Sequence, residues 1–189
     1  MRARAAQLQE RRDGVLAAAF DLFSVVPFDE VSLAHVARRA GVGTKTILRQ
    51  FGSKEGLVAA CVGWGSRREA ALRAVPAGDV RAVVRTLAAR YEAGMDTMRR
   101  YIELEDRMPV VKRGLRTARA AHHAWLAVVF DRWLPARGGT RARRLAALFG
   151  ATEIYVWWSW RRRLGLSRAD AESAMQDTLD GLVDAWRRG

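Results

Sequence analysis

The chain has 189 residues, of which half are hydrophobic and 28% are charged, and this composition excludes a generally disordered protein. Lys and Arg number 33 against 20 Asp and Glu, so the formal net charge is +13, which favours a nucleic acid or an anionic membrane surface as partner. Because Arg accounts for 30 of the 33 basic residues, and GC-rich codons alone produce such a bias, the charge does not by itself identify the partner.

Apolar residues recur at spacings of three and four along most of the chain, which predicts amphipathic helices throughout. We therefore expect an all-α fold of about nine helices. The expected spans are residues 8–26, 33–40, 44–51, 54–75, 80–106, 111–134, 140–164 and 168–188. Ser167 and Asp170 match a capping-box variant at the start of the last span. The helices before Ser53 are short and those after it are long, so we expect a domain boundary between residues 1–53 and 54–189.

The two short spans around Gly41 have the organisation of a helix-turn-helix. Ser32 is a good N-cap for the first of them, and Gly41 supplies the left-handed residue that ends it. Ala37 is small where the two helices would cross closely, and Val42, Ile47 and Phe51 are expected to face inward. The side chains then left outside, or at the edge, are Thr44, Lys45, Thr46, Leu48, Arg49 and Gln50.

Hydroxyl, ammonium, guanidinium and amide groups on this second span can reach base edges and phosphates in DNA. Its helix N-terminus adds backbone N–H donors, and Lys54 at the start of the next helix is placed to pair with phosphate. Residues 31–54 contain five basic residues and no acidic one. An amphipathic helical hairpin is also a common structural element, so this pattern alone does not decide between DNA binding and a purely structural role.

Three segments in this part of the chain favour DNA binding. They are FDEVSL at residues 28–33, VARRAGVGTKTILRQF at residues 36–51 and SKEGL at residues 53–57. In this order and spacing they resemble the N-terminal domain of TetR-family transcriptional regulators, over about a third of the chain. The remaining helices are similar to that family only in size and helical character.

The resemblance implies roles for individual side chains. Contacts to bases or to the groove are implied for Thr44 and Lys45. Phosphate contacts are implied for Ser32, Thr46 and Lys54.

Two positions depart from the usual pattern of the family. Leu48 stands where the family commonly has Tyr, and Gln50 stands where it often has His. Absence of the Tyr hydroxyl should remove one phosphate contact, so we expect either a lower affinity or compensation by Arg49.

The resemblance further implies a homodimeric repressor that a small-molecule effector releases from a palindromic operator. Residues 1–53 would then bind double-stranded DNA, and residues 54–189 would bind the effector and form the dimer. No catalysis and no cofactor are required, so an enzyme is not expected. The alternative is a helical protein that binds an apolar ligand and whose N-terminal hairpin no longer binds DNA, which the missing Tyr at Leu48 supports.

Tryptophans are concentrated in the span 140–164, where their side chains cannot all face one core. The family dimerises through its last two helices, which correspond here to residues 140–164 and 167–188. We therefore expect a dimer contact that includes Trp157, Trp158, Leu179, Leu182 and Trp186. The alternative is that this cluster is simply core.

A stripe of Met and aromatic residues in the middle helices could line a ligand cavity, because such side chains form adaptable apolar pockets. The candidate lining residues are Trp64, Tyr91, Met95, Met98, His122 and Trp125. The same pattern is typical of a helical core, and the sequence does not separate the two.

The sequence gives little support for a metal site, a nucleophilic cysteine or a membrane-spanning segment. His122 and His123 are adjacent and point about 100° apart on a helix, so they do not predict a metal site. Cys61 is the single cysteine, which excludes an internal disulfide, and its apolar surroundings indicate a buried residue and not a nucleophile. The longest weakly charged stretch, residues 146–160, is too short to span a bilayer, and no secretion signal is evident. We expect a cytoplasmic protein without a metal and without a membrane partner.

Overall fold

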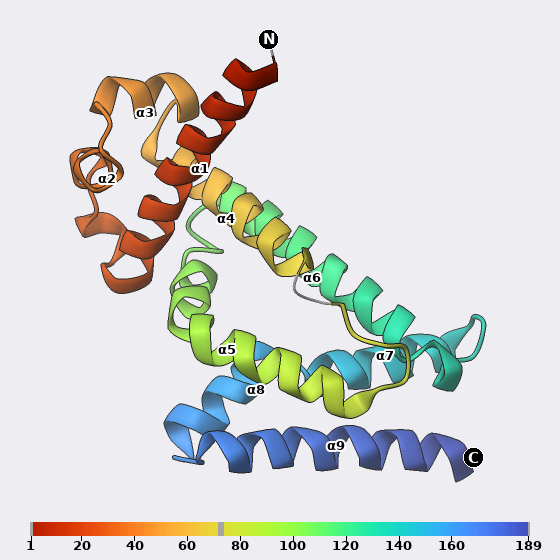
Figure 1. Cartoon of the computed structure of the whole chain (residues 1–189). Helices are drawn as coiled ribbons and strands as arrows, with labels where there is room; N and C mark the ends of the chain where they lie inside the picture. Colours follow the sequence, from red (N-terminus) through yellow and green to blue (C-terminus); the bar gives the residue numbers. More distant parts are fainter. Residues whose placement is uncertain (1, 72–73, 189) are drawn as a thin grey trace. The chain divides into compact units, whose positions relative to one another are not determined.

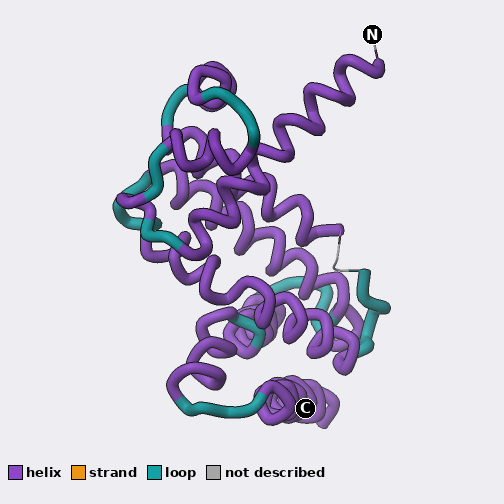
Figure 2. Tube along the Cα trace, turned by 60° about the vertical axis from the view of Figure 1, so that its left-hand side comes forward, coloured by secondary structure: helices purple, strands orange, loops and turns teal. Residues whose placement is uncertain are grey.

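The computed structural model describes residues 2–71 and 74–188, with side chains for residues 6–65 and 74–188. All regular structure within these ranges is helical, so the predicted all-α fold is confirmed (Figure 1). The main helices are α1 (Arg2–Val25), α2 (Leu33–Ala40), α3 (Thr44–Phe51), α4 (Lys54–Ala71), α5 (Val80–Glu103), α6 (Pro109–Val129), α7 (Gly139–Ala151), α8 (Ile154–Trp158) and α9 (Arg168–Arg188). The short elements between them are the 3-10 helices η1 (Phe28–Glu30) and η2 (Asp131–Trp133) and the π-helical segment η3 (Ser159–Arg163). Figure 2 shows that loops alone connect these helices in the described part of the chain.

The helices form two compact units, and α5 and α6 each contribute to both. Unit 1 comprises Met1–Ala71 and Asp96–Ala118, and unit 2 comprises Leu72–Met95 and Arg119–Gly189. Helix α4 packs against α1 and α3 and belongs to unit 1 with them.

The core of unit 1 forms where α1 packs against α2 and α4. Leu16, Val36 and Ile47 bring α1, α2 and α3 into it, and all three side chains are buried. Cys61 of α4 lies in the same core, where its thiol donates a hydrogen bond to the carbonyl oxygen of Leu16 (Sγ to O, 3.7 Å). Burial raises the pKa of this thiol to about 12, so Cys61 is the buried structural residue that the sequence indicates.

Unit 2 contains a helix break that the apolar periodicity does not predict. The span 140–164 is not one helix, because α7 ends before Thr152 and α8 begins after Glu153. The Thr152 hydroxyl donates to the carbonyl oxygen of Leu148 (2.8 Å), and such side-chain bonds compete with the continuing helix. The Glu153 carboxylate then accepts the backbone N–H of Tyr155 (3.0 Å) as the N-cap of α8. Beyond α8 the backbone passes into the π-helical turns of η3.

Other helix ends differ less from expectation. Helix α6 ends at Val129 and not near residue 134, because the chain turns there into η2, and the Val129 carbonyl accepts the N–H of Gly78 (2.7 Å). Helix α1 is already formed at Arg2. The predicted cap of α9 is confirmed, since the Asp170 N–H donates to Ser167 Oγ (3.1 Å) and the Ser167 hydroxyl donates to the Asp170 carboxylate (2.6 Å).

Candidate nucleic-acid interface

The predicted helix-turn-helix is formed by α2, a tight turn and α3 (Figure 1). Ser32 Oγ accepts the backbone N–H of His35 at 3.2 Å and thereby caps α2. At the other end Gly41 has a φ of +65°, and the N–H of Val42 donates to the carbonyl oxygen of Ala37 at 3.0 Å. This Schellman geometry needs a left-handed residue, and glycine adopts that conformation without steric cost. The turn predicted from the sequence is therefore confirmed.

The inward side of α3 is defined by Ile47, whose side chain has no exposed surface. It belongs to the same core cluster as Val36 and Ala37 of α2. Val42 and Phe51, near the two ends of α3, pack against this cluster and are partly buried. The expected inward-facing set is confirmed, and it determines which side of α3 is left outward.

The six residues of this helix that were predicted to contact DNA differ in exposure. The exposed ones are Lys45, Leu48 and Arg49, and the half-buried ones are Thr44, Thr46 and Gln50. Gln50 differs further, because its amide oxygen is buried and has no hydrogen-bond partner among the described residues. The three exposed side chains present an ammonium, an isobutyl and a guanidinium group, which suit phosphates, base edges and apolar base substituents.

The first turn of α3 adds backbone donors to this surface. Gly43 is its N-cap and provides no side-chain hydrogen bond to the helix. The first N–H groups of a helix have no acceptor within it and carry the positive end of the helix dipole. Phosphate groups bind at such ends. This end of α3 can therefore accept a DNA phosphate beside its side chains.

The expected phosphate ligands on either side of α3 make contacts within unit 1. Ser32 Oγ accepts a hydrogen bond as the cap of α2, which leaves its hydroxyl proton for another acceptor. Lys54 Nζ lies 4.1 Å from the centroid of the Phe28 ring, a cation–π contact that positions the ammonium. Ser53 caps α4 beside it by accepting the N–H of Gly56 (3.1 Å).

Two further residues, Arg12 of α1 and Gly56 of α4, lie against α3. The Arg12 guanidinium lies 4.5 Å from the centroid of the Phe51 ring, and its Nη1 donates to the carbonyl oxygen of Gln50 at 3.4 Å. A cation there also complements the C-terminal end of the helix dipole. Gly56 approaches α3 so closely that a Cβ would overlap the carbonyl oxygen of Phe51. Gly56 belongs to the SKEGL segment of the resemblance, whereas no motif in the sequence predicts the contact between Arg12 and α3.

One ion pair connects the helix-turn-helix to α1, and a second connects η1 to the turn between α5 and α6. Arg39 of α2 lies 3.2 Å from the Asp21 carboxylate of α1. Arg107, between α5 and α6, donates to both carboxylate oxygens of Asp29 in η1, at 3.1 and 3.2 Å. Both pairs are exposed, so their contribution to stability is small.

The residues predicted to line an effector pocket are distributed over both units. Trp64 and Met98 belong to unit 1, and Tyr91, Met95, His122 and Trp125 belong to unit 2. In unit 2 the Tyr91 hydroxyl donates to the carbonyl oxygen of Thr152 (2.5 Å), and His122 Nε2 lies 2.9 Å from Thr152 Oγ1. The Trp125 ring stacks on His122 with 5.7 Å between the ring centroids. The four residues of unit 2 therefore lie around the break between α7 and α8 or pack into the same core.

Described residues of unit 1 line two hollows. The larger, about 180 Å³, lies among the end of α1, η1 and the end of α5, and its lining includes Phe28, Arg100 and Arg107. The smaller, about 30 Å³, includes Met98 in its lining. Both are below the roughly 300–1,000 Å³ of sites for drug-sized ligands. Met98 is the one predicted pocket residue among their linings.

The five residues predicted at a dimer contact all lie in unit 2. Trp157 and Leu179 have no exposed surface and belong to its core. Trp158, Leu182 and Trp186 pack against the same core and are only half-buried. The first two therefore serve the core of the chain itself, and the other three retain surface for a partner.

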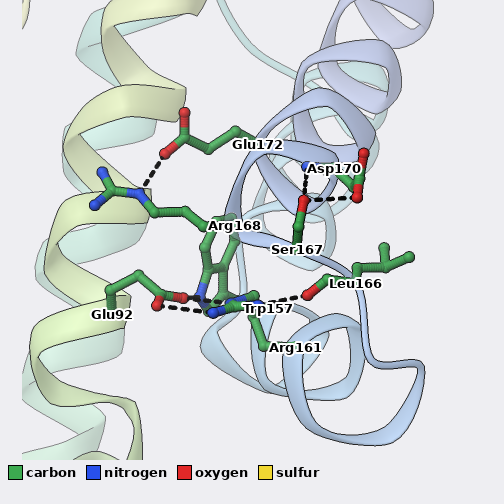
Figure 3. Close-up of polar contacts among 8 residues, drawn as sticks. All are labelled: Glu92, Trp157, Arg161, Leu166, Ser167, Arg168, Asp170 and Glu172. Carbon is green, nitrogen blue, oxygen red and sulfur yellow. Dashed lines mark hydrogen bonds and ion pairs between the residues drawn. The ribbon is translucent and has the colours of Figure 1, made fainter.

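A polar network explains why Trp157 points inward (Figure 3). Glu92 of α5 accepts hydrogen bonds from Trp157 Nε1 (3.0 Å) and from Arg161 Nε and Nη2 (2.7 and 3.1 Å). Arg161 Nη1 also donates to the carbonyl oxygen of Leu166. The hydrogen bonds from Arg161 hold the pKa of Glu92 below its ordinary value of 4.5. This network fixes α8 and η3 against α5.

No group of three or more His, Cys, Asp or Glu residues among those described is arranged to hold a metal ion. Within the described ranges, no helix combines the length and the apolar character needed to cross a membrane.

Comparisons with known proteins agree with this geometry. The profile of the family described as bacterial regulatory proteins, tetR family, matches residues 15–61. A TetR-family regulator from Streptomyces coelicolor has a similar structure, with a TM-score of 0.75 and 19% identity over 94% of this chain and 82% of that chain. GusR from Salmonella enterica is similar with a TM-score of 0.68 and 20% identity, over 93% of this chain and 96% of that one. The flavonoid-responsive regulator FrrA has a TM-score of 0.63 and 21% identity, over 94% of this chain and 97% of that one. No curated protein sequence matches the chain.

The α2–turn–α3 arrangement, with its core-anchored inner face and its polar outer face, defines a helix-turn-helix protein that binds DNA. The profile match covers this same segment. Residues 15–61 are therefore a DNA-binding domain of the tetR-family type, and the chain as a whole shares its fold with TetR-family transcriptional regulators.

Proposed function

We propose that the protein is a ligand-responsive repressor that binds a palindromic operator as a homodimer. One observation carries the DNA-contact part of this proposal: Ile47 anchors α3 in the core while Lys45, Leu48 and Arg49 face outward. A helix held in this way can lie in the major groove with its exposed side chains on base edges. We assign DNA binding to residues 1–53, and effector binding and dimerisation to residues 54–189.

The contacts are divided by chemistry. Thr44 and Lys45, at the N-terminal end of α3, would contact bases. Ser32, Thr46 and Lys54 would contact phosphates, together with the free N–H groups of the first turn of α3. Arg49, exposed one turn after Lys45, would supply the phosphate contact that a Tyr hydroxyl makes in the family and that Leu48 cannot make.

The dimer would form through the half-buried aromatic and aliphatic surface of Trp158, Leu182 and Trp186. In a two-fold symmetric dimer the same patch of both subunits forms the interface. The dimer then presents two copies of α3 to the two half-sites of the operator. Sedimentation of the native protein at micromolar concentration should give twice the chain mass. A monomer would contradict both the dimer and the palindromic site.

The effector would be a small, largely apolar molecule that binds one conformation better and so weakens DNA binding. The aromatic and Met side chains predicted for its pocket suit such a ligand, and a protein of similar fold, FrrA, is described as flavonoid-responsive. Mass spectrometry of the purified, denatured protein should reveal a bound small molecule. Operator release by that molecule, and repression of a reporter gene in its absence, test the remaining steps.

The DNA contacts are tested with the three lysines of the chain. An operator is first selected from random DNA with the full-length protein. Lys45→Ala should lose about 1–3 kcal/mol of discrimination between bases if its contact is as strong as a bidentate one. Lys54→Ala should weaken binding to all sequences evenly and reduce the salt slope by about one unit. Lys112→Ala, at an exposed lysine of α6, is the control and should leave both properties unchanged.

The binding results of these variants distinguish a base contact of Lys45 from a phosphate contact of Lys54. Unchanged specificity in Lys45→Ala would remove Lys45 from the base-contacting set. A loss in Lys54→Ala that is confined to one sequence would contradict a phosphate contact. Binding that does not depend on sequence at all would contradict the operator.

A further inference from the structure

Leu48 is an exposed apolar side chain on the helix that faces DNA. Its exposed fraction is 43%, and the other exposed large hydrophobic residues of the described chain lie outside α2 and α3. A single exposed leucine is ordinary on a protein surface. Its place on α3 is what makes Leu48 informative.

The position of Leu48 around α3 follows from helical geometry. At about 100° per residue, Leu48 lies about 100° from the buried Ile47. On the same side Thr44 lies about 60° and Lys45 about 160° from Ile47. Leu48 therefore projects between the two residues to which the proposed function assigns base contacts. Thr46, assigned to phosphate, lies about 100° from Ile47 on the opposite side.

The chemistry of Leu48 restricts what it can contact there. An isobutyl group donates no hydrogen bond, so it cannot replace the phosphate contact of a Tyr hydroxyl. In the major groove, A, G and C present hydrogen-bonding groups, whereas thymine also presents an apolar C5 methyl group. Burying one methyl group against an apolar side chain favours binding without any polar partner.

We propose that Leu48 contacts the C5 methyl group of a thymine in each half-site and thereby selects an A·T pair at that position. This inference rests on the proposed operator binding by α3. It assigns to Leu48 a specificity that neither Thr44 nor Lys45 supplies, because the contact is apolar and needs the thymine methyl group.

The test removes only that methyl group. An operator is selected with the full-length protein, and each thymine is then replaced singly by deoxyuridine, which keeps the base pair and deletes the C5 methyl. Binding is measured by fluorescence anisotropy. At one thymine position per half-site, the native protein should bind the uracil operator about fourfold more weakly, and about fifteenfold more weakly when both half-sites carry uracil.

Three variants connect this loss to Leu48. Leu48→Ala should bind the thymine operator more weakly and should no longer distinguish thymine from uracil. Leu48→Met, which keeps an apolar side chain of similar length, should retain the distinction. Leu164→Ala removes a leucine of unit 2 that is more exposed than Leu48 (67% against 43%) and should retain the native ratio of affinities. Because Leu48 is exposed, the alanine variant should fold as the native chain does, which circular dichroism verifies.

Each other outcome overturns the inference. Uracil tolerated at every thymine, or a selected site without an A·T pair at a fixed position, shows that no methyl group is contacted. A thymine preference that persists in Leu48→Ala assigns the methyl contact to another side chain. Failure to select any sequence refutes operator binding itself, and this result is distinct from a selected operator that is insensitive to uracil.

Discussion

Replacing Arg12 by alanine should loosen the last turn of α3 without unfolding unit 1. Arg12 makes two contacts to this turn, one over the Phe51 ring at 4.5 Å and one to the Gln50 carbonyl at 3.4 Å. A cation–π contact at a partly exposed site contributes about 0.5–1 kcal/mol. A cation at a helix C-terminus contributes about 0.3–1 kcal/mol, and the long hydrogen bond adds little. The expected loss in local stability is therefore about 1–2 kcal/mol.

The assay is native-state hydrogen exchange at the Gly52 amide, which donates to the carbonyl oxygen of Leu48 at 2.8 Å and so closes α3. Its exchange should accelerate about five- to thirtyfold in Arg12→Ala. Arg11→Ala is the matched control, because it removes the same charge from the neighbouring, exposed position. The effect should also shrink when Phe51→Leu has already removed the ring. Equal acceleration in the Arg11 and Arg12 variants would refute the positioning role, since loss of charge alone would then explain it.

Three further predictions concern other parts of the chain. Gly56→Ala should lower the free energy of unfolding by about 1–3 kcal/mol, because the new Cβ overlaps the Phe51 carbonyl oxygen. Gly150→Ala is the control and should not destabilise the chain, because the space around Gly150 is open. Equal melting temperatures of the two variants would contradict this prediction. The pKa of Glu92 is lowered, so its stabilising effect is complete above the ordinary value of 4.5 and is lost as the pH falls through the lowered native pKa. Glu92→Gln should therefore flatten the fall in melting temperature as the pH decreases below the ordinary pKa of 4.5, and an unchanged slope would count against the ion pair. Cys61, with its pKa raised to about 12, should not react with a thiol reagent at about pH 8 until urea unfolds the chain, and rapid reaction of the native protein would contradict its burial.

The helix-turn-helix could be predicted in detail because its determinants are local in sequence. The Ser32 cap bonds three residues ahead, and the bonds around Gly41 span five residues or fewer. Each of the two helices has eight residues, and packing them together buries Val36 of α2 and Ile47 of α3, so the periodicity of apolar residues identifies the outward side chains. The helix caps and the apolar periodicity can therefore be recognised in a single sequence.

The parts that escaped prediction depend on distant partners. Arg12 meets α3 across 38 residues of sequence, and Arg161 meets Glu92 across 69. The break between α7 and α8 lies at the Thr152 hydroxyl and the Glu153 cap, and no proline in the sequence there indicates a helix end. The inward orientation of Trp157, which the sequence placed at a dimer contact, follows from its bond to Glu92. Periodicity identifies a helical face, but it does not tell which other helix covers that face.

The outward face of α3 is tested most directly by the rate at which its lysine is modified. The chain has only three lysines, Lys45 on α3, Lys54 on α4 and Lys112 on α6, so acetylation followed by mass spectrometry reports each of them separately. With the selected operator bound, acetylation of Lys45 and Lys54 should slow strongly while that of Lys112 stays unchanged, and a shuffled duplex at the same salt concentration should protect none of them. Equal acetylation of Lys45 with and without the operator would contradict the placement of α3 in the major groove.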